Sequence, residues 1–192
     1  MEKFIARYNR PQLLGFDFDI EAGQSEQVIA NLVKQIHGAV QRHPHLRMSF
    51  TLAAMKAIAH VGLNNHFINL MVMNFGEAKP ENCVIEGTRC AMAASAIVVV
   101  RNFAKEYQVP LQRIELTPMI GVNDLVDNIF TLSDAQQLAS YVHSNDLGGL
   151  HFWSLNRDGM CPPGPLAVSP TCHSLPGVNS LAFTNAFAAP VR

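Results

Sequence analysis

The sequence has little net charge and no long apolar segment. Its 192 residues include 14 Lys and Arg against 15 Asp and Glu, a formal net charge of −1. That balance gives no electrostatic reason to expect binding to nucleic acid or to an anionic membrane surface. The longest apolar run, residues 91–100, contains Ser95 and is too short to cross a bilayer. We therefore expect neither nucleic acid nor a membrane among the partners.

Two short sequence signals are also missing. The first residues carry charges at Glu2, Lys3 and Arg7, where a signal peptide needs a continuous apolar segment, so no signal peptide is visible. Neither GxGxxG nor GxxxxGK[ST] occurs, which removes the main sequence signal for a nucleotide. A nucleotide-binding doubly wound fold is therefore disfavoured.

Cysteine is scarce, and its spacing argues against a zinc site. The four cysteines are Cys83, Cys90, Cys161 and Cys172, and none forms a CxxC pair. Cys161 and Cys172 bracket a segment rich in Pro and Gly and could form a disulfide in an oxidising compartment. Free thiols fit the sequence equally well. We expect no metal and no organic cofactor.

The apolar residues alternate between strand-like and helix-like periods, and 48% of the chain is hydrophobic, enough for one core. The expected strands are 13–21, 46–52, 67–73, 113–119 and 148–154. The expected helices are 25–41, a short one near 55–62, 88–107, and one that Ser133 and Gln136 open with a capping box and that runs to 145. Such alternation predicts an α/β fold with a parallel sheet. Residues 159–192 read as a loop-rich tail with a short helix near 180–187.

Three acids stand at alternate positions of the first expected strand. In an extended chain Asp17, Asp19 and Glu21 share one face, and Phe16, Phe18 and Ile20 take the other. Like charges this close raise one another's pKa, which is typical of a site where one carboxyl keeps its proton near neutral pH. A strand with one solvated face and a calcium site are alternatives.

Four segments, in order, resemble the chitinases of glycoside hydrolase family 18, bacterial type, which are (β/α)8 TIM barrels. Residues 15–21 resemble the end of the DxxDxDxE strand-four signature, and residues 69–76 resemble the sixth-strand form NxMxMDYG. Residues 117–124 and 152–158 are similar to the seventh and eighth strands. A complete barrel takes about 250 residues, so the resemblance implies one partial catalytic barrel over residues 1–192, with about the last five βα units.

The resemblance also implies an activity and roles for the acids. It implies hydrolysis of β-1,4-linked N-acetylglucosamine polymers, chitin or chito-oligosaccharides, by a retaining mechanism in which the sugar's own N-acetyl oxygen is the nucleophile. Glu21 would be the general acid and base. Asp19 would orient the N-acetyl group and share a proton with Glu21, and Asp17 would tune Asp19.

Other residues of the matched segments would bind the substrate. Trp153 is the single tryptophan; the resemblance makes it the floor of a sugar subsite, and a core aromatic is the alternative. The sixth-strand segment lines the acetamido pocket in this family, so the expected residues there are Met71, Met73, Asn74 and Phe75. For Met71 and Met73, simple packing is the alternative.

The sequence departs from the family pattern at three positions, two of which are among these residues. Leu14 stands where the full signature begins with Asp, Asn74 replaces an Asp, and Phe75 replaces a Tyr. Asn carries no charge and Phe donates no hydrogen bond, so the alternative function is a catalytically impaired carbohydrate-binding fragment. A partial barrel has open sheet edges, which predict self-association. The family implies an extracellular location.

Overall fold

The computed structural model describes residues 1–8, 13–21, 23–51, 66–125, 127–165 and 167–188. The chain forms two compact units, Met1–Asn69 and Leu70–Arg192. The helix expected near 55–62 lies outside the described residues. No helix among the described residues is both long and apolar enough to cross a membrane.

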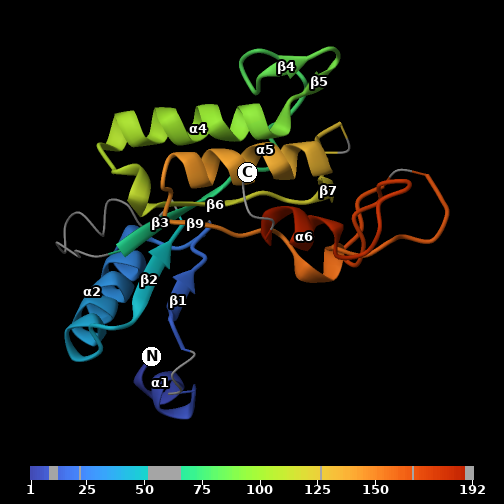
Figure 1. Ribbon diagram of the computed structural model, residues 1–192. Helices are drawn as coiled ribbons and strands as arrows, with labels where there is room; N and C mark the ends of the chain where they lie inside the picture. The colour runs from blue at the N-terminus through green and yellow to red at the C-terminus, as the bar shows by residue number, and fades with distance from the viewer. Residues whose placement is uncertain (9–12, 22, 52–65, 126, 166, 189–192) are drawn as a thin grey trace. The chain divides into compact units, whose positions relative to one another are not determined.

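The first unit is built on parallel strands. Its elements are α1 (Glu2–Tyr8), β1 (Gly15–Phe18), α2 (Glu26–Arg42), β2 (Arg47–Phe50) and β3 (His66–Met71), which runs into the second unit (Figure 1). β1 pairs with β2 and β2 with β3, both in parallel. Ser25 caps α2 through its side chain, and the helix buries a stripe at helical spacing, namely Ile29, Val33, Ile36 and Ala39.

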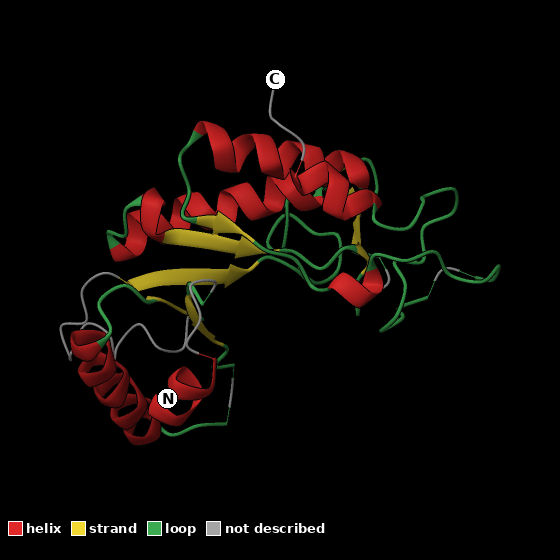
Figure 2. Cartoon of the chain, turned by 60° about the horizontal axis from the view of Figure 1, so that its bottom comes forward, coloured by secondary structure: helices red, strands yellow, loops and turns green. Residues whose placement is uncertain are grey.

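The second unit places helices against the parallel pair β6 and β9 (Figure 2). Its helices are α4 (Met92–Tyr107), α5 (Leu132–Ser144) and α6 (Ala182–Ala188), with the 3-10 turns η2 (Leu111–Arg113) and η3 (Leu155–Arg157). Its strands are β4 (Ile85–Glu86), β5 (Arg89–Cys90), β6 (Ile114–Thr117), β7 (Gly121–Val122), β8 (Ile129–Phe130) and β9 (Gly149–Leu150). α5 packs against both α4 and α6. The expected α/β fold with parallel strands is therefore confirmed.

Two expected helix boundaries are wrong. The helix expected from residue 88 begins at Met92, because Arg89 and Cys90 form strand β5 of a small hairpin. The capping box of α5 is formed by Thr131 and Asp134, two residues before the expected Ser133 and Gln136. Both four-residue patterns fit a capping box, and the earlier one is used because the helix begins at Leu132.

All four cysteines form disulfides. Cys161 pairs with Cys172, one of the two outcomes that the sequence allowed, with their Cα atoms 5.2 Å apart. Cys83 pairs with Cys90 across the β4–β5 hairpin, a pairing that the sequence did not indicate. Both bonds lie in the second unit, where each closes a short surface loop.

Candidate functional site

The three acids of the first unit lie on one exposed face. Asp17, Asp19 and Glu21 are exposed, whereas Phe16 and Phe18 are half-buried and Ile20 is buried. β1 ends at Phe18, so Asp19 and Glu21 lie just beyond the carboxyl end of a parallel strand. The structure thus shows the alternation that the sequence predicted, at the edge of the sheet where α/β proteins place their functional groups.

Two buried hydroxyls of the neighbouring strand segment fix this row. Ser49, opposite Asp17 in the β1–β2 register, donates a hydrogen bond to the Asp17 carboxylate. Thr51 Oγ1 accepts from the Ile20 N–H at 2.7 Å and donates to the Ile20 carbonyl at 2.8 Å. Because Ile20 lies between Asp19 and Glu21, Thr51 fixes the backbone that carries both acids. Neither hydroxyl was expected from the sequence, although the alternation of polar and apolar residues in Ser49-Phe50-Thr51 could have indicated them.

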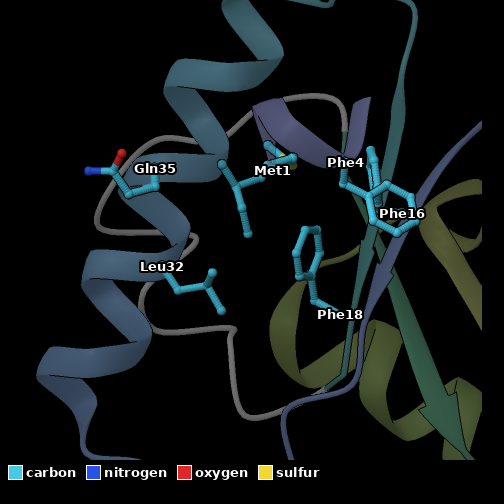
Figure 3. A pocket seen from close by; sticks show the side chains of 7 residues that line it. Met1, Phe4, Phe16, Phe18, Leu32 and Gln35 are labelled. Atoms are coloured by element: carbon cyan, nitrogen blue, oxygen red, sulfur yellow. The ribbon is translucent and has the colours of Figure 1, made fainter. Parts of the chain in front are cut away.

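The other face of β1 lines an apolar cavity. Phe16 and Phe18 of β1, Phe4 of α1, and Leu32 of α2 surround a space of about 320 Å³ (Figure 3). Gln35 contributes the polar side chain in this lining, and no acidic or basic side chain is among the described residues that line the cavity. The candidate chemistry of the first unit is therefore on the carboxylate face.

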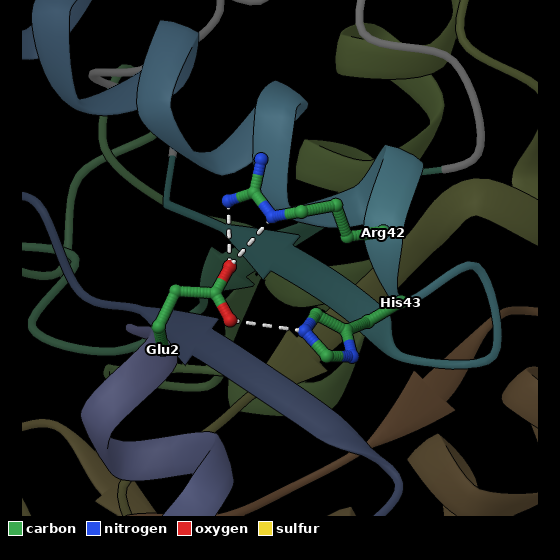
Figure 4. Close-up of polar contacts among 3 residues, drawn as sticks. All are labelled: Glu2, Arg42 and His43. Atoms are coloured by element: carbon green, nitrogen blue, oxygen red, sulfur yellow. Dashed lines mark hydrogen bonds and ion pairs between the residues drawn. The ribbon is translucent and has the colours of Figure 1, made fainter.

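A charged contact fastens α1, which covers this cavity. The Glu2 carboxylate accepts from Arg42 Nε and Nη2 at 2.9 and 2.6 Å and lies 3.1 Å from His43 Nε2 (Figure 4). The hydrogen bonds from Arg42 and then His43 lower the pKa of Glu2. Glu2 is exposed, so solvent weakens this contact.

In the second unit, Trp153 presents its side chain to solvent. It follows β9 and is 56% exposed, so it is not a core aromatic. Its N–H donates to the Pro118 carbonyl at 2.8 Å, and its carbonyl accepts from the Ile120 N–H at 3.0 Å. These bonds extend the parallel pairing of β6 and β9 to Met119 and Trp153. The peptide between Trp153 and Ser154 is cis.

The expected acetamido-pocket residues follow one another at the end of β3. Met71 is 43% exposed, and Met73, Asn74 and Phe75 are half-buried. The amide of Asn74 makes contacts within the protein: Oδ1 accepts from the Asp124 N–H at 3.0 Å, and Nδ2 donates to Asp124 Oδ2 at 2.8 Å. Asn74 therefore joins two loops of the second unit, a role that the sequence did not indicate.

β6 carries a buried acid, Glu115, opposite Gly149 of β9. Glu115 is fully buried, and its Oε2 lies 3.4 Å from His151 Nε2. A Cβ at Gly149 would lie 3.0 Å from Glu115 Oε1, so glycine makes room for the carboxylate. Glu115 lies within the expected strand 113–119, and a single acid in a strand carries no motif that would have indicated this contact.

Arg157 and Asp158 are both buried, and they form hydrogen bonds with different parts of the chain. Arg157 donates to the carbonyls of Ile120, Val122 and Ser169. Asp158 accepts from the backbone N–H groups of Phe183 and Thr184 and from the Thr184 hydroxyl, at the start of α6. Each residue therefore joins parts of the chain that are far apart in the sequence.

The candidate residues thus divide between the units. The carboxylates Asp17, Asp19 and Glu21 belong to the first, and Trp153 and residues 71–75 belong to the second. Within the described ranges, no three His, Cys, Asp or Glu side chains group in a way that could hold a metal ion. The described part of the chain therefore gives the calcium alternative no support.

Comparison with known proteins identifies relatives of one kind. No family model matches this chain. The chain is 31% identical over 131 residues to a probable bifunctional chitinase/lysozyme of Escherichia coli K12, a match that covers 63% of this chain and 14% of that protein. It is 31% identical over 99 residues to endochitinase 11 of Metarhizium anisopliae, covering 47% of this chain and 19% of that protein. The chain thus matches a small part of each relative's length.

Solved chitinase structures resemble nearly the whole chain. Active domain 2 of a thermostable chitinase from Pyrococcus furiosus, solved as catalytic-site mutants complexed with chito-oligosaccharides, has a TM-score of 0.70 and 31% identity. That match covers 97% of this chain and 62% of the other. The catalytic domain of a hyperthermophilic chitinase from the same organism has a TM-score of 0.67 and 30% identity, covering 98% and 65%. The expected resemblance to chitinase catalytic domains is therefore confirmed.

Proposed function

We propose that this chain, related in sequence and fold to chitinase catalytic domains, hydrolyses β-1,4 bonds in N-acetylglucosamine polymers. In this proposal its strands are the last five βα units of a (β/α)8 barrel, and the reaction proceeds with retention and assistance from the substrate. One observation carries the proposal. Three acids lie on one exposed face at the carboxyl end of a parallel strand, in a chain whose fold matches chitinases.

The chemistry requires one proton donor and one positioned carboxylate. Glu21 protonates the glycosidic oxygen as the acetamido oxygen of the sugar attacks C1, which breaks the bond to the leaving sugar and forms a cyclic oxazolinium ion. Asp19 accepts a hydrogen bond from the acetamido N–H and offsets the positive charge. The Glu21 carboxylate then takes a proton from the water that attacks C1. Two inversions at C1 give net retention.

The proposed sugar-binding residues belong to the second unit. The exposed indole of Trp153 offers a flat apolar surface on which the C–H face of a pyranose can stack. Met71, the most exposed of the residues from its segment, offers an apolar contact for an acetamido methyl, and Met73, Asn74 and Phe75 complete that side. No cofactor takes part in the proposed reaction.

A second candidate function is binding of chitin without hydrolysis. It is favoured by Asn74, whose amide is held by Asp124, and by Phe75, which offers no hydroxyl to the substrate. The test incubates the chain with chitohexaose and with insoluble chitin, and follows products by proton NMR. Shorter oligosaccharides that first appear as the β-anomer support the enzyme. Retention on chitin without product supports the binding fragment, and neither binding nor product contradicts both.

We also propose that the chain acts in an extracellular, oxidising compartment. Two disulfides, Cys83–Cys90 and Cys161–Cys172, support this, because such bonds persist where thiols are not kept reduced. Thiol titration of the protein purified from its native source, without reductant, tests the proposal. Four free thiols would contradict it.

Self-association through β1 is a further proposal about partners. In the strand order β1 stands at the end, with β2 beside it, so among the described residues its other edge has no strand partner. The exposed Leu14 precedes this edge. Light scattering should find oligomers at micromolar concentration that Leu14→Lys reduces, and a monodisperse monomer would contradict the proposal.

A further inference from the structure

The segment 119–122 of the second unit is held by two side chains. Asn123 Nδ2 donates to the carbonyls of Met119 and Gly121 at 2.8 and 3.1 Å. Arg157 Nη2 donates to the carbonyls of Ile120 and Val122 at 3.1 and 2.6 Å. Four consecutive backbone acceptors are therefore satisfied by one amide and one guanidinium, where a regular strand would rely on its neighbours.

Arg157 is a buried charged residue whose guanidinium donates hydrogen bonds to backbone carbonyls. It is 1% exposed, and besides Ile120 and Val122 it bonds the Ser169 carbonyl, which lies in the loop closed by the Cys161–Cys172 disulfide. Burial lowers the pKa of Arg157, and the negative charge of Asp124 partly offsets this. Burying a guanidinium is unfavourable unless hydrogen bonds compensate for the lost solvation. Such a residue fixes the geometry of the groups that it joins.

The segment held by Arg157 connects the two parts of the proposed sugar-binding surface. At one end, the Ile120 N–H donates to the Trp153 carbonyl at 3.0 Å. At the other end, Asn123 Oδ1 accepts from the Asn74 N–H at 3.2 Å, and Asp124 bonds the Asn74 amide. A shift of the segment would therefore move both Trp153 and Asn74.

We propose that Arg157 is a positioning residue that fixes segment 119–122 and thereby holds the Trp153 indole and Asn74 in their places for the substrate. Arg157 acts through backbone carbonyls and does not touch the sugar. The inference rests on the proposed function for the identity of the ligand at Trp153. The placement of Trp153 itself can be measured without any ligand.

The test uses the fact that Trp153 is the single tryptophan, so all indole fluorescence comes from this position. Arg157→Lys keeps the charge but not the planar fork, and Arg157→Met removes both. The matched controls are Arg101→Lys and Arg101→Met, at an exposed arginine of α4 that lies over the Tyr141 ring. Each protein is checked by circular dichroism and thermal melting. Acrylamide quenching is then measured without ligand, followed by titration with chitotetraose and steady-state kinetics.

We expect the Arg157 variants to change the quenching constant of Trp153 and the Arg101 variants to leave it unchanged. The chitotetraose concentration at half-saturation (the midpoint) should rise about two- to fivefold in Arg157→Met, up to the effect of losing the stacked indole, and less in Arg157→Lys. KM should rise more than kcat falls, since the carboxylates Asp17, Asp19 and Glu21 are not held by this segment. A purely structural role would lower the melting temperature and leave the quenching and the midpoint unchanged.

Three outcomes overturn the inference. Folded Arg157 variants with wild-type quenching and midpoint would show that Arg157 does not position Trp153. Failure of both variants to fold would assign Arg157 to the stability of the whole unit. A change of the same size in the Arg101 variants would show that the effect is not specific. If wild type neither binds nor cleaves chitotetraose, the proposed function fails, and quenching of the free variants still decides the positioning role.

Discussion

Replacing Thr51 with Val removes one hydroxyl and keeps the shape of the side chain. In the structure that hydroxyl bonds both the N–H and the carbonyl of Ile20, at 2.7 and 2.8 Å, and both residues are buried, with exposures of 4% for Thr51 and 6% for Ile20. The substitution leaves one buried donor and one buried acceptor without a partner. At about 1–2 kcal/mol each, the loss in unfolding free energy is about 2–4 kcal/mol.

The same substitution should affect turnover, because Ile20 lies between Asp19 and Glu21. Freed backbone at Ile20 lets both acids move, and misplacement by about 1 Å costs up to about 10²-fold in rate. We expect kcat on a fluorogenic chitobioside to fall by about ten- to a hundredfold, with KM changed less because Trp153 is in the other unit.

The assay compares Thr51→Val with Thr51→Ser, which keeps the hydroxyl, by urea unfolding and by steady-state kinetics. Thr51→Ser should retain most of the stability and the rate. If Thr51→Val unfolds within about 0.5 kcal/mol of wild type and keeps its kcat, Thr51 does not hold the acids and the reasoning is refuted.

Three other predictions follow from the second unit. Trp153→Ala should weaken chitotetraose binding by about 1 kcal/mol, roughly fivefold in Kd, and Trp153→Phe by less; equal affinities in calorimetry would contradict stacking. Burial lowers the pKa of His173. The unfolded chain therefore takes up a proton at a higher pH than the folded chain. The free energy of unfolding should fall as the pH drops below about 6.5, by at most about 1.4 kcal/mol per pH unit. His173→Asn keeps an acceptor for the Leu175 N–H and should make the melting temperature depend less on pH. An unchanged pH dependence would contradict this role of His173. Asp158→Ala removes the acceptor of three hydrogen bonds at α6 and should cost about 2–4 kcal/mol in urea unfolding, whereas the exposed Asp127→Ala should cost little.

The parts of the fold that follow from local pattern could be predicted from the sequence. The alternation of Asp17, Asp19 and Glu21 follows from the two-residue period of an extended chain, and the structure shows it. The parallel strands followed from the regular alternation of the two periods. Trp153 is 56% exposed, and its role as the floor of a sugar subsite stays a prediction.

The parts that depend on contacts between distant residues could not be predicted. Thr51 bonds Ile20 across 31 residues, and Arg157 bonds Ile120 across 37, distances over which one sequence carries no pattern. The motif that contains Asn74 did not indicate that its amide bonds Asp124 of another loop. Side-chain to backbone contacts of this kind are set by the tertiary fold, so the residue type alone does not reveal them.

Glu21 is the proton donor in the proposed reaction, and its replacement tests that role most directly. The measurement is the turnover of a fluorogenic chitobioside by the Glu21→Gln variant, together with its affinity for chitotetraose from Trp153 fluorescence. The control is Glu86→Gln, at an exposed residue of the β4–β5 hairpin. An amide cannot donate the proton, so Glu21→Gln should lose at least about 10²-fold in kcat and keep wild-type affinity, and Glu86→Gln should match wild type. Wild-type turnover by Glu21→Gln would contradict the account.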